Sequence, residues 1–158
     1  KIQSAQKEVG EITLKKDIHK TVSYYIKKYE TSDPFQIAKE LNIELAIGDM
    51  GTRLGCYMYM KRHKCIFLNE NLDEQEQRFV MAHELGHAIL HPRQNCYFIR
   101  NKTFLSANRI EIEANTFAIE LLVPDTEIIE HPDLTIGQLA RMTGYAEDIL
   151  RYKKIFNS

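Results

Sequence analysis

A helical segment that carries the pattern HExxH constrains this chain more than any other feature of its sequence. The pattern runs from His83 to His87 inside the apolar stretch 79–91, and Pro92 follows that stretch. Residues four apart lie on the same face of an α-helix, so both imidazoles can reach one ion. Glu84 is rotated around the helix, close enough to take a proton from a water on that ion. The segment therefore predicts a helix that bears a metal site.

This pattern is typical of zinc hydrolases. A catalytic zinc is usually held by three protein ligands and lowers the pKa of a bound water to about 7, so that a hydroxide can attack a polarised carbonyl. The two histidines supply two ligands. A third histidine in the metzincin spacing would fall where Arg93 stands. His91 continues the four-residue spacing, but its place at the helix end favours contact with the last carbonyls of the helix.

We expect the third ligand from a second helix, predicted over residues 109–123. Glu111 and Glu113 flank its apolar stripe at similar angles, so helical geometry does not choose between them. Asn108 and Glu111 have the spacing of a capping box, which gives Glu111 a structural role. Glu113 has no such role and would be costly beside apolar residues unless it faced a cation. Glu113 is therefore the expected ligand, followed in preference by Glu111 and then His91.

The other hydrophobic patterns predict an α+β domain. The expected helices are residues 17–29, 33–41, 71–91 and 109–123, and the expected strands are residues 42–47, 54–60 and 65–68. Residues 93–106 are expected to be irregular. The fold class is a small zincin-like domain with a short antiparallel or mixed sheet of about three strands. This sheet packs on the motif helix and on the second, ligand-bearing helix, and a helical C-terminal tail follows.

The last two strands are expected to form a hairpin that turns at residues 61–64 and places Met60 opposite Cys65. The run 65–69, directly before the motif helix, has two interpretations. It is either an exposed edge strand that binds an extended substrate by strand addition, or a buried strand of the core. The sequence leaves both open.

Length and composition favour a single metallopeptidase domain over residues 1–158. Its size is that of one domain, and 44% hydrophobic residues supply a core without disulfides. Residues 1–16 are polar and expected to be flexible. Residues 134–154 have a helix-turn-helix cadence and are expected to belong to the same domain. A recognition helix there would present Glu147 and Asp148 to phosphates, so direct DNA binding is not expected.

Charge and cysteine usage limit the compartment and the partners. The net charge of −1 gives no general attraction to nucleic acid or to an anionic membrane. Cys56, Cys65 and Cys96 form no CxxC pair, which indicates reduced thiols and a cytoplasmic location. The apolar runs are far shorter than a bilayer span, and the first residues contain no signal-peptide core. We expect a cytoplasmic protein with no membrane partner.

The motif region resembles the ImmA/IrrE family of metallopeptidases. The family pattern pairs HExxH with a downstream EAN-x-FA segment that ends in LL-x-P. Here HELGHAILH at residues 83–91 is followed by EANTFAIELLVP at residues 113–124. The resemblance covers about residues 40–125. It implies a zinc peptidase in which His83, His87 and Glu113 bind the metal and Glu84 is the general base.

The resemblance also implies a substrate class. The family occurs mostly in bacteria, their phages and mobile elements, and its members act as anti-repressors that cleave or relieve a helix-turn-helix repressor. We therefore expect a site-specific zinc peptidase whose partner is such a repressor. Recognition is expected outside the metal, through the basic segment 93–109 or the C-terminal helices. The alternative is a non-catalytic zinc-containing regulator that binds the repressor or DNA, and the intact Glu84 argues against it.

Overall fold

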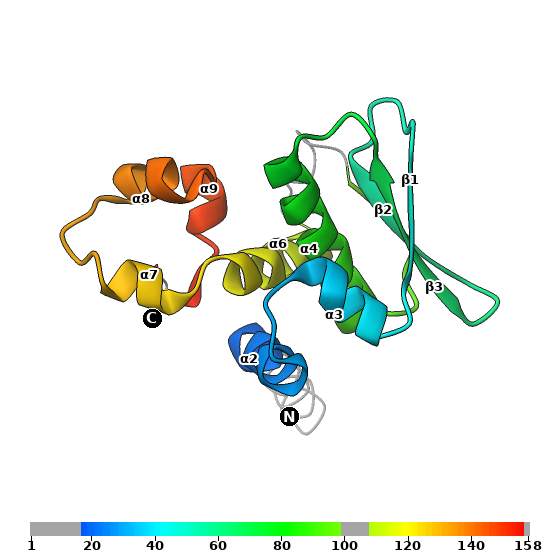
Figure 1. The fold of residues 1–158 in the computed structure, drawn as a ribbon, viewed down its shortest axis with the longest axis horizontal. Helices are drawn as coiled ribbons and strands as arrows, with labels where there is room; N and C mark the ends of the chain where they lie inside the picture. Colours follow the sequence, from blue (N-terminus) through cyan, green and yellow to red (C-terminus); the bar gives the residue numbers. More distant parts are fainter. Residues whose placement is uncertain (1–16, 99–107, 157–158) are drawn as a thin grey trace, which may run out of the picture.

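The computed structural model describes residues 17–98 and 108–156, so the expected flexible segment 1–16 lies outside the described residues. The fold is α+β and is built on a mixed sheet (Figure 1). The described strands are β1 (Glu44–Gly48), β2 (Gly55–Met60), β3 (His63–Asn69) and β4 (Cys96–Phe98). Their order is β1-β3-β2-β4, with β1 parallel to β3 and with β2 antiparallel to β3 and β4.

Two long helices stack on this sheet. The motif helix α4 (Glu74–Leu90) packs against β2 and β3, and α6 (Arg109–Leu122) packs on α4. The helices α2 (Ile18–Tyr29) and α3 (Pro34–Glu40) contact α6 and α4, respectively. This arrangement confirms the expected zincin-like domain with a motif helix and a second helix.

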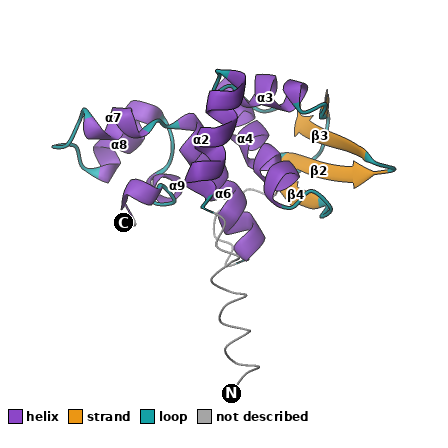
Figure 2. Ribbon diagram, turned by 90° about the horizontal axis from the view of Figure 1, so that it is seen from below, coloured by secondary structure: helices purple, strands orange, loops and turns teal. Residues whose placement is uncertain are grey.

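The tail forms a lobe at the far end of α6. Figures 1 and 2 show the sheet at one end of the molecule and this lobe at the other. The lobe contains α7 (Asp125–Ile129), α8 (Ile136–Thr143), α9 (Glu147–Leu150) and the 3-10 turn η1 (Lys154–Phe156). Gly144 ends α8 with a φ of 77°, a left-handed conformation that suits glycine. Two short helices joined at this position are as expected, whereas α7 was not predicted.

The hairpin between β2 and β3 is tighter than expected. Lys61 and Arg62 form a two-residue turn with φ values of 48° and 67°, and Met60 pairs with His63. Positive φ at both central residues is the geometry of a type I′ turn, whose twist matches that of the flanking strands. The prediction that Met60 faces Cys65 was wrong, because Cys65 pairs with Met58.

The sheet also decides between the two interpretations of residues 65–69. β3 lies between β1 and β2, so it is an inner strand and the core interpretation holds. The extra strand β4 falls in the segment that was expected to be irregular. It pairs with only three residues of β2, from Gly55 to Tyr57, and three residues are too few for a clear alternating pattern.

The motif helix is buried on most of its circumference. Every residue from Phe79 to Ala88 is buried, because the sheet covers one side of α4 and α6 covers another. Asp73 and Glu76 close a capping box, so the helix begins at Glu74 and not at the expected Asn71. Gly86 lets α6 approach closely, since a Cβ atom there would lie 3.3 Å from the Cα of Ala114. The polar residues of HExxH are therefore enclosed by apolar packing.

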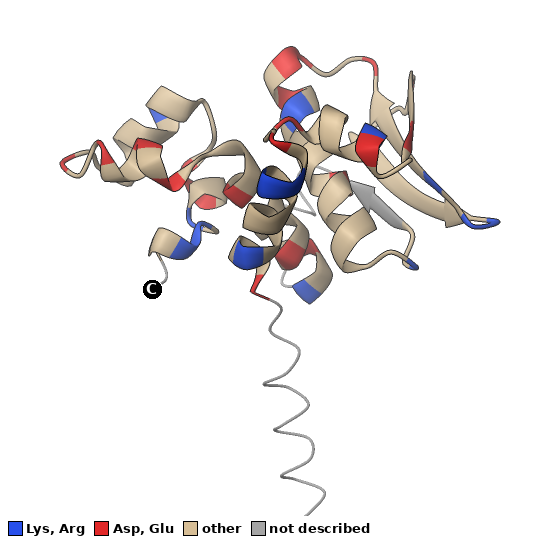
Figure 3. Cartoon of the chain, turned by 60° about the horizontal axis from the view of Figure 1, so that its bottom comes forward, with Lys and Arg blue, Asp and Glu red and all other residues tan. Residues whose placement is uncertain are grey.

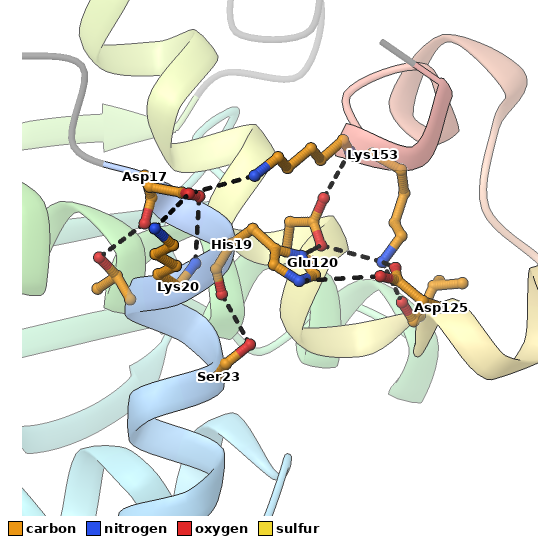
Figure 4. Close-up of polar contacts among 10 residues, drawn as sticks. Asp17, His19, Lys20, Ser23, Glu120, Asp125 and Lys153 are labelled. Atoms are coloured by element: carbon orange, nitrogen blue, oxygen red, sulfur yellow. Dashed lines mark hydrogen bonds and ion pairs between the residues drawn. The ribbon is translucent and has the colours of Figure 1, made fainter. Parts of the chain in front are cut away.

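A buried ion cluster fastens the tail lobe to the helices (Figure 4). Lys153 Nζ lies 3.0 Å from Glu120 Oε2 and 2.5 Å from Asp125 Oδ1, and it donates to the Val123 carbonyl at 2.7 Å. His19 Nδ1 on α2 contacts Glu120 Oε2 at 2.9 Å. Lys153 and Glu120 are each 1% exposed. The cluster thus joins α2, α6, α7 and the C-terminal turn through one buried carboxylate.

Removing the cation from this cluster should destabilise the fold. Lys153→Met leaves the buried Glu120 without its charge partner, and breaking a buried pair in this way costs about 3–5 kcal/mol. Lys20→Met is the matched control, because the Lys20 side chain is 83% exposed and lies 3.8 Å from Asp17. An exposed pair of this kind contributes about 0–1 kcal/mol. Urea unfolding measures both variants, and equal free energies of unfolding would contradict the assigned role of Lys153.

Candidate metal centre

The two histidines of HExxH face one another inside the core. His83 and His87 stand one turn apart on α4 and are 0% and 1% exposed. Their Nε2 atoms are 3.0 Å apart, and their rings meet edge to face with centroids 4.7 Å apart. Both predicted histidine ligands are therefore brought together.

Asn115 on α6 fixes the orientation of the first histidine. Its Oδ1 lies 2.9 Å from His83 Nδ1, and Asn115 is fully buried. A carboxamide oxygen only accepts hydrogen bonds, so the proton resides on His83 Nδ1. The lone pair of His83 Nε2 then points toward His87. This is the contact by which a residue outside the ligand set orients a metal-binding histidine.

Glu111 completes the group. Its Oε2 lies 3.3 Å from His83 Nε2, and its Oε1 lies 3.3 Å from His87 Nε2. His83, His87 and Glu111 each place one donor atom within 4.8 Å of the other two. The Glu111 side chain is 16% exposed, which makes it the donor nearest to solvent. Two imidazole nitrogens and one carboxylate thus converge on one point.

The structure places Glu113, the expected third ligand, elsewhere. Glu113 Oε2 lies 2.8 Å from His91 Nε2, and Glu113 Oε1 accepts a hydrogen bond from Arg109 Nε at 2.7 Å. Neither Glu113 nor His91 belongs to the group formed with His83 and His87.

The capping argument that favoured Glu113 does not hold. Asn108 caps α6 by accepting from the backbone N–H of Ile110, while the Glu111 carboxylate turns toward the imidazoles. Glu111 and Asn115 are four residues apart and share one helical face. That spacing was readable in the sequence and would have indicated both residues, but the contact of Asn115 with His83 was missed.

Glu84 lies where α4 packs against the sheet. It is fully buried, and its two carboxylate oxygens have no side-chain hydrogen-bond partner in residues 17–98 and 108–156. Burial raises the pKa of Glu84 well above its ordinary value, and the charge of Glu111 raises it further, against a weaker effect of the Tyr57 backbone N–H. Gly55 on β2 lets α4 lie close to the sheet here, since a Cβ atom there would lie 2.6 Å from Val80 Cγ1.

The electrostatics of the group fit a bound cation. Burial lowers the pKa of His83 to about 4, with a smaller opposing effect of Glu111, so the imidazole is neutral and free to act as a ligand. Burial alone would raise the pKa of Glu111, but contacts with His83 and His87 outweigh it and lower the pKa to about 2. A cation among these donors would satisfy the facing lone pairs. Its charge would also favour the ionised form of Glu84.

Among the residues whose side chains the structure describes, no cysteine belongs to this group. Burial, together with the charge of Glu84, raises the pKa of the Cys56 thiol to about 11, so this cysteine is a neutral thiol. Cys56 and Cys65 are both free thiols. The donor set is therefore two imidazoles and a carboxylate, as in zinc sites that keep a fourth position open for water or substrate.

Comparison with known proteins identifies the family of the chain. Residues 35–152 match a peptidase family described as the IrrE N-terminal-like domain. The chain is 40% identical over 141 residues to uncharacterized immunity region protein 2 of Bacillus phage phi105, which covers 87% of this chain and 89% of that protein. It is 34% identical over 117 residues to metallopeptidase ImmA of Bacillus subtilis (strain 168), which covers 73% of this chain and 68% of that protein. The chain therefore belongs to the ImmA/IrrE family of metallopeptidases.

Two general features of the structure bear on its partners. None of the helices in residues 17–98 and 108–156 combines the length and the apolar character of a membrane span. Lys and Arg are interspersed with Asp and Glu over the described elements (Figure 3). Glu147 and Asp148 occupy the first turn of α9, as expected, where a recognition helix would need to meet phosphates.

Glu111→Ala should weaken metal binding more than any change at Glu113. The substitution removes a donor atom from the group, whereas loss of an outer contact typically weakens metal affinity by roughly 10–100-fold. Zinc affinity measured by competition with a chelator dye compares Glu111→Ala with Glu113→Ala. Equal affinities of the two variants would show that Glu111 is not the third ligand.

Proposed function

We propose that this chain is a zinc-dependent peptidase that cuts a helix-turn-helix repressor at a specific site. The observation that carries the proposal is the convergence of His83, His87 and Glu111, with the carboxylate of Glu84 buried beside them. Family membership supports the peptidase class. We propose in addition that the metal is zinc, that these residues hold it and act on water, and that the substrate is a repressor.

The donor set supports zinc as the metal. Imidazole and carboxylate ligands with one open position are usual for catalytic zinc, and His83, His87 and Glu111 supply such a set. Zinc bound there would lower the pKa of a water ligand and polarise the carbonyl of a peptide. Asn115 keeps the His83 lone pair directed at the site, and the burial of both histidines excludes competing solvent.

Glu84 is the proposed general base. It follows a ligand directly on α4, so its carboxylate is held within reach of the attacking water without occupying a coordination position. It accepts the proton of that water and passes it to the leaving amine, which are the two proton transfers of peptide hydrolysis. Its buried position between α4 and β2 limits its motion, so the carboxylate is positioned before a substrate arrives.

The proposed substrate rests on the family and on the lobe. One relative is named as a phage immunity region protein and the other as metallopeptidase ImmA, which supports a repressor as the target. Recognition through the tail is supported by its contact with the motif helix, where Gln75 Nε2 on α4 donates to the Thr143 carbonyl on α8 at 3.0 Å. The alternative docking segment, residues 93–109, lies largely outside the described residues.

Glu84→Gln should separate catalysis from binding. The amide cannot accept the proton of the water, so the cleavage rate should fall by about 10²–10⁴-fold, while zinc content and thermal unfolding stay as in the wild type. The test substrates are a helix-turn-helix repressor, sought among the genes that flank this one, and unstructured casein, with fragments identified by mass spectrometry. The wild type should cut the repressor at one site and casein slowly.

Two outcomes of this experiment would contradict the proposal. Rapid cleavage of casein at many sites would rule out narrow specificity. If Glu84→Gln relieves repression as well as the wild type does, the chain is a regulator that binds the repressor without cutting it.

A further inference from the structure

A second polar group lies one helical turn beyond the metal centre. His91 Nε2 is 2.8 Å from Glu113 Oε2, and Arg109 Nε donates to Glu113 Oε1 at 2.7 Å. We call His91, Glu113 and Arg109 the rim clamp. The side chains of His91 and Glu113 are 18% and 21% exposed, whereas those of the two histidine ligands are 0% and 1% exposed. The rim clamp therefore lies at the solvent side of the buried centre.

The rim clamp joins the two elements that carry the metal donors. His91 follows His87 by four residues and forms the C-terminal cap of α4. Arg109 and Glu113 occupy the first turns of α6, and Glu111 lies between them in the chain. A contact between His91 and Glu113 therefore restrains the turn of α6 that bears Glu111. The next restraint along α6 is the close packing of Ala114 against Gly86.

This restraint matters because Glu111 is the donor nearest to solvent. Its side chain is the most exposed of the three donors, and its described contacts are those with His83 and His87. Residual motion of the Glu111 side chain would have to be lost when a metal binds, and that loss would lower affinity. If the rim clamp already holds the first turn of α6, Glu111 loses less freedom when the metal ion binds.

We propose that the rim clamp positions Glu111 for metal binding, so that His91 and Glu113 raise metal affinity without being ligands. This inference rests on the metal centre proposed above. The role is indirect, because both oxygens of Glu113 are engaged, one by His91 and the other by Arg109. The guanidinium of Arg109 balances the charge of Glu113, so this carboxylate needs no metal ion as a charge partner.

A double-mutant cycle tests whether His91 and Glu113 act on metal affinity as one coupled unit. Zinc affinity is measured by chelator competition for the wild type, His91→Ala, Glu113→Ala and the double variant. If Glu113 acts through His91, each single substitution lowers zinc affinity by roughly 10–100-fold. The double variant then binds zinc as tightly as the single variant with the lower affinity. Single variants with wild-type affinity, or a double variant whose loss is the product of the single losses, would overturn the inference.

Two controls keep this experiment specific. Glu147→Ala removes another Glu–Arg pair at the same four-residue spacing, with Arg151 at 3.8 Å, and should leave zinc affinity unchanged. Glu113→Gln keeps an oxygen for the contacts of the clamp and should recover part of the affinity lost in Glu113→Ala. Failure of Glu113→Gln to bind zinc more tightly than Glu113→Ala would contradict a positioning role.

Thermal unfolding of the metal-free variants shows whether they are folded. Similar unfolding temperatures for Glu113→Ala and Glu147→Ala, with different zinc affinities, support positioning. If Glu113→Ala and His91→Ala lose zinc affinity only because they no longer fold, the positioning role is contradicted. If the wild type itself binds no zinc, the proposed metal centre fails. If the wild type binds zinc and Glu113→Ala binds it equally well, only the rim clamp fails.

Discussion

The structure depends on the burial of three polar side chains in an apolar helix. His83, Glu84 and His87 are at most 1% exposed, and α4 has the sheet on one side and α6 on another. A buried polar group without a partner costs free energy of several kcal/mol in apolar surroundings. The fold reduces this cost by bringing Asn115 and Glu111 from α6 to the histidines, and a shared cation would satisfy the remaining lone pairs. Close packing at Gly86 lets α6 approach α4 in this way, and Gly55 lets the sheet approach α4 from the other side.

The same constraint explains which parts of the fold were predictable from the sequence. Helices whose caps and apolar spacing are local were correct, as Asp17 and Asp33 show at the starts of α2 and α3. The type I′ turn at Lys61 and Arg62 was missed, because neither residue is among those that favour positive φ. β4 was missed because its existence depends on pairing with β2, which is a long-range contact.

The candidate site was predictable on α4 but not on α6. The four-residue spacing of His83 and His87 is fixed within one helix, so local geometry was sufficient. The choice between Glu111 and Glu113 depends on how α6 is rotated against α4, and neither its apolar stripe nor its capping pattern specifies this rotation. In the structure, Glu111 faces His83 and His87, and Glu113 faces His91. The two glutamates thus bind different histidines of the same helix.

The tail lobe links the metal centre to the proposed recognition of a protein substrate. Glu120 and Glu111 belong to the same helix, so α6 is fastened to the lobe by Lys153 at one end and faces the metal centre at the other. A rigid helix between these points would keep a docked substrate in a fixed relation to Glu84. Such an arrangement would support the proposed narrow specificity, because docking raises the local concentration of one scissile segment.

X-ray absorption spectroscopy of the zinc-loaded protein tests the central claim most directly. We expect one zinc per chain with two imidazole ligands, carboxylate or water oxygens completing the shell, distances of about 2.0–2.2 Å and no sulfur. In Glu111→Ala the two imidazoles should remain as ligands while one oxygen is lost or replaced by water. A sulfur ligand, a single imidazole, or an unchanged affinity and shell in Glu111→Ala would contradict the assignment of His83, His87 and Glu111 as the metal ligands.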